Sequence, residues 1–237
     1  MKLNYLSLEC LNKKNIPLPD ADTIDICIFS IENFSFLKNN IALLSAQEQK
    51  KALSLRQEED RLRFYTSHVL LRRILSLYLL YPAEKLLFAV EEHGKPRLYH
   101  EGSSFPKIHF NLSHSGEFAA LAFSLASPVG IDIEKVRSGI RAKTLVRRFF
   151  HPDELSEFSA LDASGQQAFL FRRWTVREAF LKGIGTGLSI PPDSFYVQQL
   201  SSMFRIKNGQ KDYSFWRIEP VPVPDGYYCS IAYRSFE

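Results

Sequence analysis

The chain has little of what a secreted or membrane protein needs. No apolar run reaches the roughly 20 residues required to cross a bilayer, and the start, MKLNYLSLEC, lacks the apolar centre of a signal peptide. The three cysteines, Cys10, Cys27 and Cys229, are scattered and odd in number, which indicates reduced thiols rather than a disulfide framework or a zinc site. We therefore expect a cytoplasmic protein.

A dense run of one charge is also missing. The formal net charge is +4, and arginines occur in pairs such as Arg72-Arg73 and Arg147-Arg148. A nucleic-acid-binding protein would normally show a denser basic stripe and a recognisable module. Acidic protein surfaces and phosphorylated small molecules suit this mild positive charge better, so we expect neither nucleic acid nor membrane as a partner.

What is present is a globular composition, 45% hydrophobic and 24% charged, without low-complexity segments. A length of 237 residues suffices for one large domain or for two lobes. The alternating, β-branched segment 22–31 predicts a strand. Ser45 and Glu48 form a capping-box signature, which predicts a helix from about residue 46. A second helix is expected to end near Leu80, before Tyr81-Pro82.

Short apolar segments separated by turn residues predict strands after these helices, at 85–92, 96–99, 107–113 and 118–125. The small residues and proline of 124–130 mark a boundary. The second half repeats the plan, with a strand at 129–135 and helices near 140–150, 153–161 and 165–184. Further strands are expected at about 194–199, 203–207, 214–219 and 227–233, with Asn208-Gly209 as a hairpin turn. The pattern predicts two α+β lobes, 1–126 and 127–237.

Two carboxylates, Asp132 and Glu134, lie in the apolar segment VGIDIEKVR (129–137). Because strand side chains alternate, both leave one face while Ile131 and Ile133 enter the core. Solvated residues neutralised by neighbouring cations would explain them, since most charged side chains are simply exposed. Two like charges on one face also predict a cation nearby, such as a lysine or a metal ion.

The segment RRWTVREAFLKGIGTGL (172–188) places Glu178 and Lys182 four residues apart on one helix face. A surface ion pair is the simplest explanation. The alternating Gly183, Gly185 and Gly187 indicate a helix C-cap followed by a loose turn, and are weak evidence for phosphate binding.

Two loops carry further polar side chains. Ser113 and His114 end an apolar strand, where a polar turn is the simplest explanation. A nucleophilic dyad of this pair is disfavoured, because adjacent residues of an extended chain point opposite ways. Lys95 lies at a tight turn, where an exposed hairpin tip is the simplest explanation. Taken together, three carboxylates with nearby lysines and a histidine predict a site for Mg²⁺ and a polyphosphate, as phosphoryl transfer requires.

The motifs FNLSHSGE, GIDIEK and WTVREAFLK, in that order, with GKP upstream and GLSIPPDSF downstream, resemble the 4′-phosphopantetheinyl transferases. The resemblance is to the large, pseudo-dimeric class that primes peptide and polyketide synthases. It extends from about residue 45 to the end. It implies two similar α+β lobes in one monomeric chain, with coenzyme A in the cleft between them.

The resemblance also implies roles for single residues. Asp132, Glu134 and Glu178 would hold Mg²⁺, or Mn²⁺, against the pyrophosphate, and Lys182 would contact the phosphates and the departing oxygen. The expected coenzyme contacts are Lys51, Arg63, Lys95, Ser113 and His114. The family reaction is attack by a serine hydroxyl of an apo carrier protein on the β-phosphorus of coenzyme A, which releases adenosine 3′,5′-bisphosphate.

The chain departs from the family pattern at two positions. Arg177 replaces the lysine of the usual W-x-x-K-E-A signature, and Glu48 stands near Lys51 where a lysine is usual. Arginine presents a planar fork instead of a compact ammonium, so the coenzyme contact is expected to change. Glu178, or a water on the metal, is expected to accept the serine proton. The acidic carrier helix is expected to dock between Arg141 and Phe169, around RRFF (147–150).

Two alternatives stay open on the sequence. A coenzyme A pyrophosphohydrolase would use the same metal site with water as the nucleophile. A non-catalytic carrier-binding protein would keep the fold, but it predicts the loss of a metal ligand, and all three candidates are present.

Overall fold

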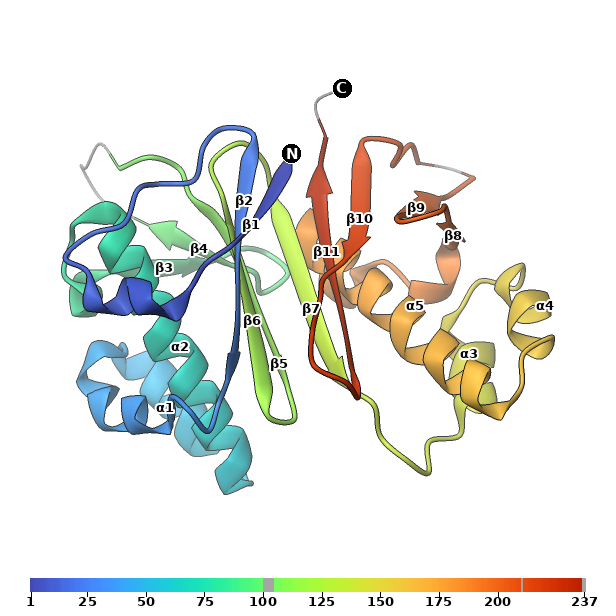
Figure 1. Cartoon of the computed structure of the whole chain (residues 1–237), viewed down its shortest axis with the longest axis horizontal. Helices are drawn as coiled ribbons and strands as arrows, with labels where there is room; N and C mark the ends of the chain where they lie inside the picture. Colours follow the sequence, from blue (N-terminus) through green and yellow to red (C-terminus); the bar gives the residue numbers. More distant parts are fainter. Residues whose placement is uncertain (100–104, 210, 236–237) are drawn as a thin grey trace. The chain divides into compact units, whose positions relative to one another are not determined.

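The computed structural model describes residues 1–99, 105–209 and 211–235. These residues form two compact units. The first comprises 1–90 and 96–126, and the second comprises 91–95 and 127–237. Each unit has its own sheet with helices packed on it (Figure 1), which confirms the predicted α+β class with two lobes. In the part of the chain that is described, no helix is long and apolar enough to cross a membrane.

The sheet of the first unit has the strand order β1-β2-β6-β5. Its strands are β1 (Lys2–Tyr5), β2 (Thr23–Ser30), β5 (His109–Ser115) and β6 (Phe118–Ser124). β1 pairs with β2 in parallel, whereas the other two pairings are antiparallel. β3 (Leu87–Val90) and β4 (Pro96–Tyr99) form a separate antiparallel hairpin.

Two helices accompany this sheet, α1 (Ala46–Ser54) and α2 (Glu58–Leu79). The predicted capping box is confirmed, since the Ser45 hydroxyl accepts from the Glu48 main chain and the Glu48 carboxylate accepts from the Ser45 main chain. α2 begins with three acidic residues, whose negative charges are stabilised by the partial positive charge at the start of the helix. Leu80, which follows the helix, adopts the left-handed conformation. Short 3₁₀ segments lie at η1 (Leu8–Asn12), η2 (Ser35–Leu43) and η3 (Ala83–Lys85). The apolar face of α2 and the strands enclose one core.

The sheet of the second unit is antiparallel in the order β7-β11-β10-β9-β8. Its strands are β7 (Val129–Lys135), β8 (Tyr196–Gln199), β9 (Phe204–Lys207), β10 (Trp216–Pro220) and β11 (Tyr227–Arg234). Asn208 and Gly209 follow β9 directly, and the antiparallel neighbour of β9 in the sheet is β10, so the two residues stand in the connection between these strands, as predicted. The Asn208 side-chain amide donates to the Ser194 carbonyl oxygen at 3.0 Å, and its side-chain oxygen accepts from the Lys211 main chain at 3.1 Å.

The helices of this unit are α3 (Ala142–Phe149), α4 (Glu154–Ser159) and α5 (Ala163–Ile184), and η4 (Gly187–Ser189) and η5 (Pro192–Ser194) follow α5. α5 crosses the sheet and contacts chiefly β7 and β11 (Figure 1). Asp162 caps its start by accepting from the Gly165 main chain at 2.8 Å, and Gly185 ends it in the left-handed conformation. Residues of α5 enter two apolar clusters, one with β8–β10 and one with α3 and α4.

Two glycines let α5 lie unusually close to β7. A Cβ atom at Gly130 would overlap the Ala179 carbonyl oxygen and the Gly183 nitrogen of α5. A Cβ atom at Gly183 would lie 2.6 Å from the Trp216 ring. Gly130 therefore needs glycine, because main-chain atoms in a close-packed interior cannot give way, and a methyl group at Gly183 would displace the Trp216 ring.

We expect Gly130→Ala to lower the free energy of unfolding by about 3 kcal/mol, at the upper end of typical overpacking, or to displace α5. Gly209→Ala is the matched control, because nothing lies within 4 Å of the added methyl group. Urea unfolding followed by circular dichroism measures both variants. Equal stability of the two variants would show that the contact at Gly130 is not tight.

Candidate functional site

The face of β7 that α5 covers carries two carboxylates. Gly130, Asp132 and Glu134 share this face, since every second side chain of a strand points the same way. Asp132 is only 3% exposed and Glu134 is half-buried. The sequence pattern predicted this common face, but not that a helix would cover it.

The opposing residues of α5 are Glu178 and Lys182, one helical turn apart. The Lys182 ammonium donates to Asp132 Oδ1 at 2.6 Å and to the Ile131 carbonyl oxygen at 3.4 Å. Lys182 therefore pairs with a carboxylate of β7, whereas the helix spacing alone suggested a surface ion pair with Glu178.

The electrostatics of this face disfavour a further negative charge. Burial raises the pKa of Glu178, and the charge of Asp132 raises it further; Lys182 opposes this shift, and Glu134 adds to it. The pKa of Glu178 thus responds to both strand carboxylates. Carboxylates gathered on one face attract a cation, because a cation offsets their repulsion.

A hard divalent ion fits the chemistry of these donors, since carboxylate oxygens are its preferred ligands. Within residues 1–99, 105–209 and 211–235, however, no three His, Cys, Asp or Glu side chains are gathered as a finished metal site. The nearest cation to Asp132 is the Lys182 ammonium. The residue types therefore fit a metal ion, while in this structure the Lys182 ammonium neutralises the charge of Asp132.

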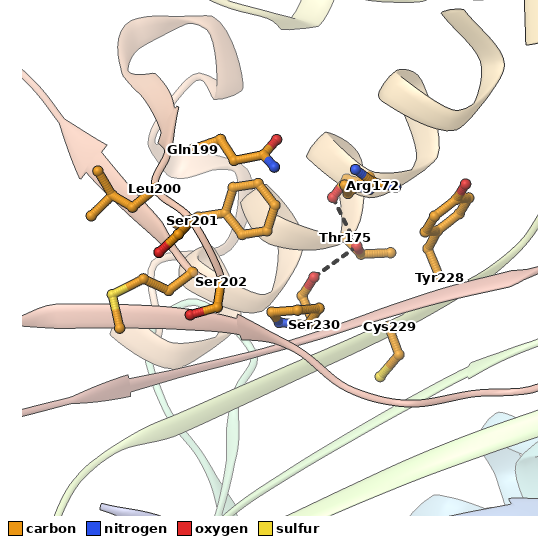
Figure 2. Close-up of a pocket in the computed structure, with 12 residues that line it drawn as sticks. Arg172, Thr175, Gln199, Leu200, Ser201, Ser202, Tyr228, Cys229 and Ser230 are labelled. Atoms are coloured by element: carbon orange, nitrogen blue, oxygen red, sulfur yellow. Dashed lines mark hydrogen bonds between the residues drawn. The ribbon is translucent and has the colours of Figure 1, made fainter. Parts of the chain in front are cut away.

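A hydrogen bond between hydroxyls joins α5 to β11 beside these carboxylates. Thr175 Oγ1 lies 2.9 Å from Ser230 Oγ, and Ser230 stands opposite Asp132 in the ladder of β7 and β11 (Figure 2). Both residues line a pocket of about 300 Å³. The rest of its lining comes from Arg172, Gln199, Leu200, Ser201, Ser202, Met203, Phe204, Pro220, Tyr228 and Cys229.

The carboxyl end of α5 is held by the segment 91–95. The Lys95 ammonium donates to the carbonyl oxygens of Lys182 at 2.7 Å, Val129 at 3.0 Å and Gly183 at 3.1 Å. An ammonium has three N–H donors, so these contacts use its full capacity. In this structure Lys95 binds main chain, although the sequence predicted a phosphate contact.

Arg177 points into the interior of the second unit. Its guanidinium is fully buried, pairs with the buried carboxylate of Glu154, and donates through Nε to the Pro192 carbonyl oxygen at 3.2 Å. It also stacks on the Phe150 ring, with the guanidinium carbon 4.0 Å from the ring centroid. The arginine that replaces the usual lysine therefore joins α5 to α4 and η5.

In the first unit, Arg63 of α2 donates to the Gly116 carbonyl oxygen at 3.2 Å, at the turn between β5 and β6. This contact brings it to the turn that follows Ser113 and His114 on β5. His114 is exposed and Ser113 is buried. Lys51 is exposed on α1, and no contact places it with the other three.

Glu48 serves the fold of the first unit. Besides capping α1, its carboxylate accepts from the buried Arg72 guanidinium at 2.5 Å. Arg72 also donates to the carbonyl oxygens of Ala83 and Leu86, each at 2.9 Å. The acidic residue found where the family usually has a lysine is thus half of a partly buried ion pair.

Sequence reasoning missed two kinds of supporting residue. Gly130 belongs to the GIDIEK motif and lies two residues before Asp132, on the same face of the strand. A glycine at this position could have indicated that another element packs closely on this face. Thr175 and Ser230 carried no signal, because their contact spans 55 positions.

Two family models match the chain. The 4′-phosphopantetheinyl transferase superfamily matches residues 128–232, and the N-terminal domain of 4′-phosphopantetheinyl transferases matches residues 33–126. The two matches together cover most of the described chain.

Individual proteins similar to this chain are also 4′-phosphopantetheinyl transferases. A 4′-phosphopantetheinyl transferase of Bacillus subtilis is 36% identical over 67% of each chain. The transferase gsp of Aneurinibacillus migulanus is 33% identical over 83% of this chain and 78% of its own. The transferase HetI of a Nostoc species is 36% identical over 65% of each chain.

We expect Arg177→Met to lower the free energy of unfolding by about 3 kcal/mol, because it leaves the Glu154 carboxylate buried beside only Arg173. Arg177→Lys should lose less, since it keeps the charge. The folded variants should bind coenzyme A with unchanged Kd in calorimetric titrations. Arg205→Met, at an exposed position of β9, is the control. A tenfold weaker Kd at unchanged stability would instead make Arg177 a coenzyme contact.

Proposed function

The chain belongs to the 4′-phosphopantetheinyl transferase superfamily and transfers 4′-phosphopantetheine from coenzyme A to carrier proteins, and we propose that the polar face between β7 and α5 performs this transfer. The observation that carries the proposal is the 2.6 Å contact of Lys182 with Asp132, with Asp132 and Glu134 close enough to Glu178 to raise its pKa.

The reaction joins a serine oxygen of the carrier to the β-phosphorus of coenzyme A. The bond between this phosphorus and the bridging pyrophosphate oxygen breaks, and adenosine 3′,5′-bisphosphate leaves. Such a transfer asks for little covalent chemistry from the protein, so positioning and charge neutralisation are the main tasks.

Glu178 is the residue we assign to the serine proton. Burial and the neighbouring carboxylates raise its pKa when no cation is bound, whereas a divalent cation would lower it, so a water held by the cation is the alternative proton acceptor. Lys182 would hydrogen-bond the departing pyrophosphate oxygen and stabilise the charge that develops there. Its contact with Asp132 holds the ammonium on the face where the phosphates would lie.

Asp132, Glu134 and Glu178 are the residues that would hold Mg²⁺, or Mn²⁺. When bound, the ion would neutralise phosphate charge and polarise the scissile bond. Lys182 donates to Asp132 Oδ1 and would share with the ion the task of offsetting the negative charge of this face.

Four residues of the first unit are proposed to bind the nucleotide end of the coenzyme: Lys51, Arg63, Ser113 and His114. The contact of Arg63 with the turn after His114 supports a common site for these two. Lys95 stays a predicted phosphate contact only if its ammonium leaves the three carbonyl oxygens.

We expect Asp132→Asn to slow transfer at least about 100-fold, because it removes a negative metal ligand and the partner of Lys182. Intact-mass spectrometry of an apo carrier protein incubated with coenzyme A and Mg²⁺ measures the gain of phosphopantetheine, about 340 Da. Asp225→Asn, at an exposed turn, is the control.

Chelation of divalent ions should abolish the mass gain in the wild-type protein. Full activity of Asp132→Asn would contradict the proposed site. Consumption of coenzyme A without modification of any carrier would indicate the hydrolase.

The docking surface for the carrier is proposed to be α3 and its start. Lys143, Arg147 and Arg148 are exposed on this helix, Arg141 precedes it, and it contains no acidic residue. Its apolar residues, including Val146, pack inward. A basic helix of this kind complements an acidic carrier helix.

We expect the double substitution Arg147→Glu and Arg148→Glu to raise KM for the carrier about tenfold or more, because it replaces attraction by repulsion at the rim of the contact. KM for coenzyme A should not change. Steady-state kinetics at low and high salt test this, and the difference in carrier KM between wild type and the double variant should shrink as the salt concentration rises. Arg205→Glu is the charge-matched control. An unchanged carrier KM would place docking elsewhere.

A further inference from the structure

We propose that Lys95 is a positioning residue, which holds the carboxyl end of α5 against the start of β7 and thereby places Lys182 over Asp132. This inference rests on the proposed role of Lys182. It differs from the phosphate contact that the sequence predicted for Lys95.

The contacts of the ammonium carry the argument. α5 ends at Ile184, so the carbonyl oxygens of Lys182 and Gly183 belong to its last turn. Lys95 donates to both, and its third donor reaches Val129, the first residue of β7. One side chain therefore joins the end of the helix to the beginning of the strand.

The glycines after α5 let the chain turn where it meets the segment 91–95. Gly185 and Gly187 have φ angles of +76° and +50°, which favour glycine, and Gly185 lies close to the side chains of Lys95 and Glu91. Gly187 lies beneath the His93 carbonyl oxygen, and Ser189 Oγ is 3.1 Å from His93 Nδ1. The whole segment 91–95 thus lies on the loop that follows the helix, which explains the alternating glycines without a phosphate.

The contact is electrostatically favourable. The carboxyl end of a helix carries partial negative charge, and a cation there is stabilised. Burial lowers the pKa of Lys95 to about 8, and the nearby Glu91 opposes this shift. The group is therefore mainly protonated at neutral pH and keeps all three donors.

The consequence falls on Lys182. The residue whose main-chain oxygen accepts from Lys95 at 2.7 Å is the one whose side chain donates to Asp132 at 2.6 Å. Gly130 and Gly183 set the distance between β7 and α5, and Lys95 sets where the helix ends along the strand. A displacement of Lys182 by about 1 Å can cost 100-fold in rate.

The test compares Lys95→Met, which keeps the length of the side chain and removes the ammonium, with Lys95→Arg, which keeps charge and donors. Lys207→Met, at an exposed position of β9, is the control. For each folded variant, kcat and KM are measured with an apo carrier, and Kd for coenzyme A is measured by calorimetry. Thermal melting gives the folded fraction.

We expect Lys95→Met to lower kcat about 10-fold to 100-fold, with Kd for coenzyme A within twofold of wild type, and Lys95→Arg to recover part of the loss. A Kd weakened tenfold with kcat unchanged would make Lys95 a phosphate contact and overturn the proposal. Unchanged kcat and Kd would overturn it as well. Asp132→Asn is assayed in parallel, and its full activity would refute the proposed site independently of Lys95.

A pH profile adds a readout that a purely structural role would not move. Above pH 8 Lys95 loses its proton and one donor, so wild-type kcat should fall with rising pH near this value. Glu91, on its own segment, is the charged group that acts on its pKa, and the elements that Lys95 joins also carry Lys182 on α5 and Asp132 on β7. Lys95→Arg should lose this decline, because a guanidinium stays charged. An identical decline in Lys95→Arg would assign it to another group.

Discussion

The close approach of α5 to β7 at Gly130 is the constraint on which the site depends. Without a side chain at Gly130, the main chain of Ala179 and Gly183 lies directly on the strand. Since Asp132 follows Gly130 on the same face, and Lys182 precedes Gly183 on the helix, one packing contact fixes both partners of the ion pair. The distance between the charged groups is thus determined by glycine packing, and only secondarily by the charges themselves.

Polar contacts then fix the other degrees of freedom of α5. Thr175 and Ser230 join the middle of the helix to β11, and the buried pair of Arg177 with Glu154 joins its outer side to α4. A buried ion pair contributes little net stability, because desolvation offsets its attraction, but a helix held on several sides cannot rotate or slide. Such restraint suits a site in which positioning is the main contribution to rate.

The sequence predicted local structure well wherever local chemistry decides it. The capping box at Ser45, the strand at 129–135 and the long helix ending near Ile184 follow from capping, alternation and glycine preference. The connection at Asn208-Gly209 likewise follows from local turn preference, and contacts of Asn208 with Ser194 and Lys211 support it. Motif resemblance identified the charged residues, yet only the three-dimensional structure shows that Lys95 contacts carbonyl oxygens and that Arg177 and Glu48 form buried or partly buried ion pairs. Sequence spacing cannot distinguish a lysine that binds carbonyl oxygens from one that binds phosphate.

The same reasoning explains why so many charges tolerate burial in one small unit. Three carboxylates near one another would destabilise the folded state if nothing offset their repulsion. Lys182 neutralises Asp132 directly, while burial, with a further contribution from the charges of Asp132 and Glu134, raises the pKa of Glu178. The flanks of the same helix enter two apolar clusters, one with β8–β10 and one with α3 and α4. This apolar packing holds the carboxylates close together despite their repulsion, and a divalent cation would lessen that repulsion, which favours its binding here.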